Sequence, residues 1–174
     1  MVSPSRQAAP RDLERVRELL NTWLIPNDTR LPSDRFADLA RALRLRDRRD
    51  ASRLRALRDD LRAAVEDGPG GLGRLDPWIA RLKIRPVLTG EGPAVRFAHA
   101  GGKAGEYLAI VLRAIQEATW TRLKACPDCR WVFFDHTRNG TKRWCLMNAR
   151  GPTGRACGTI DKVRRFRARQ RDKR

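Results

Sequence analysis

The chain has 174 residues, enough for one ordinary domain and a small second one. Its 38 Lys and Arg residues exceed its 20 Asp and Glu residues, which gives a formal net charge of +18. Such an excess indicates a polyanionic partner, either a nucleic acid or an anionic surface. No apolar run approaches the roughly 20 residues that span a bilayer, so a membrane protein is not expected.

Three amphipathic helices are predicted in the first part of the chain. The first covers residues 12–24, with Asp12 as its N-cap. Ser33 is expected to cap the second helix and Asp50 the third. Apolar residues at helical spacing define the buried faces of the three helices: Leu13, Val16, Leu20, Trp23 and Leu24; then Phe36, Leu39, Ala40 and Leu43; then Leu54, Leu57, Leu61 and Val65.

The middle of the chain predicts a hairpin between two helices. Residues 68–71 are a Gly- and Pro-rich break, after which Asp76 and Pro77 open a short helix. Residues 84–89 and 95–99 read as strands that flank a turn. A long helix follows over about residues 103–123. Four large aromatic residues within residues 1–120 are expected to lie in the core of this part of the chain: Trp23, Trp78, Tyr107 and Trp120.

All four cysteines lie in the last third of the chain, as a C-P-D-C knuckle at Cys126 and Cys129 followed by Cys145 and Cys157. Four thiolates match a tetrahedral structural zinc site. The first ten residues do not resemble a secretory signal, so a cytoplasmic protein is expected, in which a disulfide is the less favoured alternative. Because Cys157 follows Cys145 after a long gap, His136 is an alternative fourth ligand.

A small zinc module is expected around these cysteines. Residues 130–135 have strand character, and Asn139-Gly140 is a hairpin turn signal. Residues 142–145 would return as the second strand, and residues 151–154 would form a surface loop. The predicted fold is therefore α+β, with a mostly helical domain that contains one hairpin over residues 1–120. A zinc-ribbon-like module with a basic C-terminal helix follows over residues 121–174.

The charge is concentrated in that module. Residues 121–174 carry a net charge of +12, against +6 for residues 1–120. Most of the cationic residues are Arg, which is typical of a GC-rich genome, but such a bias does not explain an asymmetry within one chain. A helix that starts at Gly158 or Thr159 is expected to dock on the sheet through Val163 and Phe166, with Ile160 beside them, against Trp131, Phe133 and Trp144.

Docked in this way, the helix would turn its arginines outward toward phosphates or guanine edges. The expected partner is a nucleic acid, DNA rather than RNA, and no membrane. An RNA- or ribosome-associated zinc protein, a zinc-built module for protein interaction and a solvated basic tail are the alternatives. A second copy or a protein of the transcription machinery are further candidate partners. The candidate nucleic-acid contacts are Arg130, Arg138, Lys142, Arg143, Lys162, Arg164, Arg165, Arg167, Arg169 and Arg171.

Catalysis is not expected. The sequence has no Gly-rich phosphate loop and no HExxH motif, and a zinc ion held by four cysteines has no open position for water. The knuckle fits the C-P-x-x-C motif of zinc deaminases, but neither His99 nor His136 is followed by Glu two residues later, as those enzymes require.

The segment CPDCRWVFFDHTRNGTKRWCLM, with the later Cys-Gly and VRRFRAR, resembles the CGNR zinc finger. The N-terminal part, with ELLNTWL, a hairpin and a long helix, is similar to the ABATE domain that precedes this finger in many bacterial proteins. The resemblance implies zinc ligation by all four cysteines and DNA binding by a transcriptional regulator, in some cases stress-induced. The naming tetrapeptide is here Cys157-Gly158-Thr159-Ile160, without its Asn and Arg, and an eleven-residue insertion separates the last two cysteines.

Overall fold

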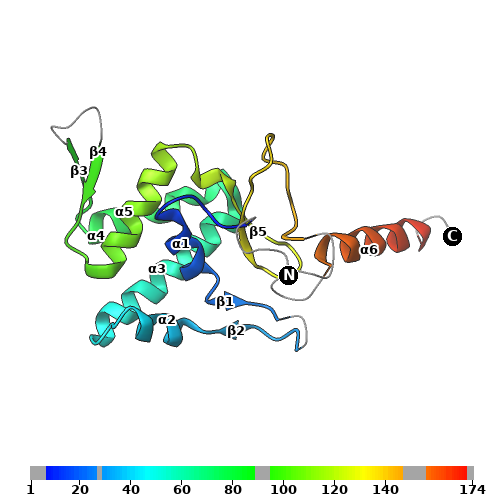
Figure 1. Ribbon diagram of the computed structural model, residues 1–174, viewed down its shortest axis with the longest axis horizontal. Helices are drawn as coiled ribbons and strands as arrows, with labels where there is room; N and C mark the ends of the chain where they lie inside the picture. The colour runs from blue at the N-terminus through cyan, green and yellow to red at the C-terminus, as the bar shows by residue number, and fades with distance from the viewer. Residues whose placement is uncertain (1–6, 27–28, 89–94, 147–155, 172–174) are drawn as a thin grey trace.

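Helices form the centre of the molecule, and the C-terminal helix extends away from it (Figure 1). The computed structural model describes residues 7–26, 29–88, 95–146 and 156–171. Helices α1 (Leu13–Leu20), α3 (Arg48–Asp67) and α5 (Gly102–Gln116) pack against one another. The shorter helices are α2 (Phe36–Ala42), η2 (Gly68–Leu75), α4 (Asp76–Arg81) and η3 (Trp120–Arg122), and the chain ends in α6 (Cys157–Arg171).

The described strands form three antiparallel pairs. β1 (Trp23–Leu24) pairs with β2 (Ser33–Asp34), β3 (Arg85–Leu88) with β4 (Val95–Ala98), and β5 (Leu123–Ala125) with β6 (Val132–Phe134). The β3–β4 pair confirms the predicted hairpin, whose turn lies outside the described residues. Mixed helices and small hairpins, followed by a cysteine cluster and a C-terminal helix, confirm the predicted α+β class.

One hydrophobic core joins the helices to the third strand pair. The predicted face of α3 lies in it, with Leu54, Leu57 and Leu61 fully buried. Val132 and Phe134 of β6 belong to the same core. The predicted core aromatics Trp78, Tyr107 and Trp120 are buried, whereas Trp23 is half-buried beneath the guanidinium of Arg62.

Two helices are shorter than predicted, for identifiable reasons. Helix α1 ends at Leu20, where the chain turns into β1. The buried guanidinium of Arg62 stabilises this turn because it donates hydrogen bonds to the carbonyls of Leu20 (2.6 Å) and Trp23 (3.0 Å). The fifth ends at Gln116, because Ala118 has a left-handed backbone (φ 55°) that an α-helix cannot continue.

The predicted helix caps are also corrected. Asp12 makes no capping bond, and Ser33 lies in β2. The side chains that accept hydrogen bonds at these helix starts are Asp34, from the N–H of Phe36, and Asp47, from the N–H of Arg49. Asp34 follows the predicted Ser33 by one residue, and Asp47 precedes the predicted Asp50 by three, so Asp50 lies inside α3.

Candidate metal centre

The knuckle is the turn of the β5–β6 hairpin. β6 pairs with β5, which comes before Cys126, so the prediction that residues 142–145 form the second strand was wrong. The N–H of Cys126 donates to the carbonyl of Trp131 (2.9 Å), and the N–H of Arg130 donates to the carbonyl of Cys126 (2.9 Å). These bonds close the turn and hold both knuckle sulfurs on one side of it.

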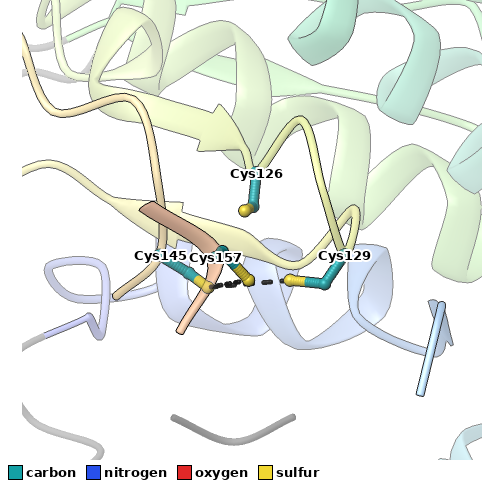
Figure 2. Close-up of side chains that lie close together, drawn as sticks. All are labelled: Cys126, Cys129, Cys145 and Cys157. Atoms are coloured by element: carbon teal, nitrogen blue, oxygen red, sulfur yellow. Dashed lines mark hydrogen bonds between the residues drawn. The ribbon is translucent and has the colours of Figure 1, made fainter. Parts of the chain in front are cut away.

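The four cysteine side chains converge from three segments of the chain. Cys126 and Cys129 come from the knuckle, Cys145 from the segment after the loop, and Cys157 from the first residue of α6 (Figure 2). All four residues are fully buried, and their sulfur atoms lie within 4.8 Å of one another. Two of these separations are 3.6 Å, between the sulfurs of Cys129 and Cys145, and 3.7 Å, between those of Cys145 and Cys157.

These distances fit a metal centre. A tetrahedron with Zn–S bonds of about 2.3 Å has sulfur–sulfur edges of about 3.8 Å. A disulfide needs a separation of about 2.05 Å, and all four cysteines are free. The four cysteines are therefore positioned to bind one metal ion, and soft thiolate ligands in a closed site are consistent with Zn²⁺.

The thiols also need a cation to ionise together. Hydrogen bonding to the Cys129 thiol, and then to those of Cys145 and Cys157, lowers the pKa of Cys126. Bonding to Cys126 raises the pKa of Cys157. In the absence of a metal, the Cys126 thiolate is thus stabilised by hydrogen bonds from the protonated thiols of the other three cysteines. A bound zinc ion would displace those protons.

His136 is not a member of the cluster. Its side chain is exposed, its Nε2 atom lies 2.8 Å from the carbonyl oxygen of Ala8, and its ring lies against Phe134. Because His136 is engaged there, Cys157 takes the fourth position of the cluster.

Asp135 organises the loop that leads to Cys145. Its carboxylate accepts hydrogen bonds from the N–H and hydroxyl of Thr137 and from the N–H of Lys142. Burial opposes ionisation, but these bonds and the charge of Lys124 hold the pKa of Asp135 below its usual value. Since the carboxylate takes the N–H of Lys142, this segment turns around Asp135 and does not form the predicted strand.

Buried polar side chains from the N-terminal part hold the metal centre in place. The buried amide of Gln7 donates to the carbonyl of Cys145 (2.8 Å) and accepts from the indole of Trp131 (3.0 Å). Arg62 donates to the carbonyl of Arg130 (2.9 Å). Burial lowers the pKa of Arg62 to about 10, so the group stays charged near neutral pH. The N–H of Ile25 donates to the carbonyl of Cys129.

Sequence reasoning missed these contacts and Asp135. An Asp two residues before Thr is a local turn signal that could have identified Asp135. Gln7 and Arg62 carry no comparable signal, because their partners are far away in the chain.

The candidate nucleic-acid contacts lie in three separate parts of the structure: a groove, a loop and helix α6. Arg130, Lys142 and Arg143 line a groove of about 670 Å³ between the end of α3 and the zinc finger. Arg130 pairs there with Glu66 at 3.1 Å. Arg138 is exposed in the loop before Cys145. The remaining six lie on α6: Lys162, Arg164, Arg165, Arg167, Arg169 and Arg171.

The prediction that α6 docks through its apolar side was wrong. Val163 is 42% exposed and Phe166 62% exposed, and Cys157 and Gly158 are the buried residues of α6. The surface expected to receive them is already occupied, since Phe133 is buried against the cysteine cluster and Trp131 contacts Gln7. The helix instead contacts the finger through Arg165, which stacks over Trp144 and pairs with Asp161 within α6, and through Arg164, whose guanidinium lies 4.0 Å from the carboxylate of Asp128.

Comparison with known proteins supports this description of the finger. Residues 122–170 match the family model of the CGNR zinc finger. None of the curated proteins compared with the chain matches it. Within the described residues, no helix combines the length and apolar character needed to cross a membrane.

Proposed function

We propose that this protein is a bacterial transcription regulator that acts by binding rather than catalysis and contacts DNA through α6. The observation that carries the proposal is that α6 begins at Cys157, a member of the metal cluster. A bound zinc ion would thus fix the direction of the helix at its first residue. The first turns of the helix contact the segments around the cluster, and the helix then extends away from the body (Figure 1).

The charge of α6 suits a polyanion. Six of its 15 residues are Lys or Arg, and Asp161 is its one acidic residue, paired with Arg165. A helix of 15 residues is about 22 Å long, and its diameter of about 10–12 Å fits the width of the DNA major groove, which is about 12 Å. Guanidinium groups bind phosphate oxygens in a bidentate manner.

The N-terminal part is proposed to be an ABATE-like domain of a stress-responsive regulator in the cytoplasm. The resemblance of its elements to that domain and the CGNR match next to it support this assignment. The buried bonds of Gln7 and Arg62 to the finger would couple any change in the helices to α6.

The test is a salt titration of duplex DNA binding by the zinc-loaded chain, with the same titration on single-stranded RNA. If α6 contacts about six phosphates, the slope of log K against log salt should lie near −5. Chelated protein is the matched control and should lose affinity, because α6 loses its anchor. A flat salt response would contradict the proposal, and a preference for RNA would favour the alternative partner.

A further inference from the structure

An apolar and amide-bearing stripe runs along the solvent side of α6. At 3.6 residues per turn, Val163, Phe166 and Gln170 fall on one line of the helix. All three are exposed. Within the described part of the chain there are four exposed large hydrophobic residues: Val163 and Phe166 of the stripe, and Leu31 and Leu88, which lie outside α6. Exposure of Phe on a projecting helix indicates a surface that is covered in a complex.

Cationic residues border this stripe on both sides. Lys162 and Arg169 lie along one side of it, and Arg167 and Arg171 along the other, where they share a surface with Phe166 and Gln170. Asp161 and Arg165 lie on the opposite side, toward Trp144 of the finger. The stripe therefore faces away from the body, and any partner that covers it also meets positive charge on either side.

We infer that this stripe is the base-contacting face of α6 in the major groove and that it reads A·T pairs. The inference rests on the proposed function. Duplex DNA has the matching chemistry, because two phosphate backbones border a row of base edges. In the major groove an apolar side chain contacts the thymine methyl group, and Gln bonds the N6 and N7 atoms of adenine. The bordering cations contact phosphates and position the helix.

The length of the stripe defines the size of the site. From Val163 to Gln170 the helix rises about 10 Å. This distance corresponds to about three base-pair steps of 3.4 Å. The expected recognition core is therefore about three consecutive positions in which A·T pairs are selected.

The test selects bound duplexes from a random pool with the zinc-loaded full-length chain and then measures affinities for the selected and mismatched duplexes. We expect Phe166→Ala and Gln170→Ala to reduce the preference for the A·T core by about 5-fold to about 150-fold, with an unchanged salt slope. Arg169→Ala should weaken binding to all duplexes alike and make the salt slope shallower by about one. Leu88→Ala removes an apolar side chain outside α6 that is even more exposed than Phe166 and should change neither.

The outcomes separate this inference from the proposed function. If wild-type protein does not bind duplex DNA, both fail. If it binds DNA and both Phe166→Ala and Gln170→Ala leave the selected sequences unchanged, the inference is overturned and the proposed function stands. The same holds if Phe166→Ala binds DNA as the wild type does but loses a protein partner in a pull-down. Circular dichroism checks that each variant keeps its helix content, which an exposed side chain is not expected to alter.

Discussion

The side chain of Asn21 pairs with the backbone of Val132 as a neighbouring strand would. Its Oδ1 accepts from the N–H of Val132 (2.8 Å), and its Nδ2 donates to the carbonyl of the same residue (2.8 Å). Two residues further along the same edge, the N–H of Phe134 donates to the carbonyl of Gln7 (3.0 Å). β5 occupies the other edge of β6, so both edges of this short strand are satisfied.

Asn21→Ala should therefore destabilise the whole protein. The substitution leaves the buried N–H of Val132 without a partner and its carbonyl with only the longer bond from Arg17 (3.3 Å), and we expect the free energy of unfolding to fall by about 2 kcal/mol. Urea denaturation measures the change. Asn139→Ala, in the exposed loop, is the matched control and should stay within about 0.5 kcal/mol of wild type. Equal stabilities of the two variants would show that the pairing with Val132 contributes nothing.

Cys157→Ser should abolish stoichiometric zinc binding at neutral pH, whereas His136→Ala should retain it. A hydroxyl is a poor replacement for a thiolate ligand, and His136 is held by Ala8 outside the cluster. Metal analysis after dialysis gives the zinc content of each protein. Retention of one zinc by Cys157→Ser together with its loss in His136→Ala would assign the fourth ligand to the histidine.

Asp135→Asn should loosen the loop between β6 and Cys145. The new amide cannot accept from both Thr137 and Lys142, because one of its two acceptors has become a donor. We expect a loss of about 2 kcal/mol in stability and faster release of zinc to a chromogenic chelator. The exposed substitution Asp38→Asn serves as the control. A zinc-release rate equal to that of wild type would contradict the role assigned to the Asp135 carboxylate.

Asp34 should contribute an acid-sensitive part of the stability. The hydrogen bond from Arg58 holds the pKa of Asp34 well below its usual range, although burial opposes ionisation. The contribution is complete above the unfolded pKa of about 3.9 and is lost as pH falls through the lower, folded pKa. Asp34→Asn should thus be less stable at pH 6 and should lose less stability between pH 4 and pH 2.

The measurement for Asp34 is the difference between the urea midpoints of wild type and Asp34→Asn across that range. Acid also releases zinc from both proteins, so the difference reports on Asp34 and each curve alone does not. Asp38→Asn, at an exposed pair with Arg41, should follow the wild-type curve. A constant difference from pH 6 to pH 2 would exclude Asp34 as the titrating group.

The parts predicted from sequence are those that depend on local spacing. The 3.6-residue pattern predicted the buried face of α3 at Leu54, Leu57 and Leu61, and the C-x2-C knuckle predicted the cysteine cluster. The burial of Arg58 and Arg62 was not predicted: both have the helical spacing of the buried face of α3, but a guanidinium group is rarely buried unless it is paired, and their partners are distant in the sequence. Arg58 is buried because Asp34 and Thr22 reach it from distant parts of the chain.

The prediction that α6 docks through its apolar side was wrong for a related reason. Its sequence has one apolar side, and the usual expectation is that such a side packs on the nearest core. The surface near the cysteines was already filled by Trp131 and Phe133, whose partners include Gln7. Local periodicity identified the helix but held no information about whether a surface was left to receive it.

The pairing of Asn21 and Gln7 with the edge of β6 has a practical consequence for protein engineering. A chimera that carries residues 122–170 on a foreign scaffold would lose both edge partners of Val132 and Phe134. An open strand edge recruits strands from other molecules, so such a graft would tend to aggregate even with its metal in place. A transplant that keeps the residue 7 segment and supplies an amide in the position of Asn21 would be the soluble design.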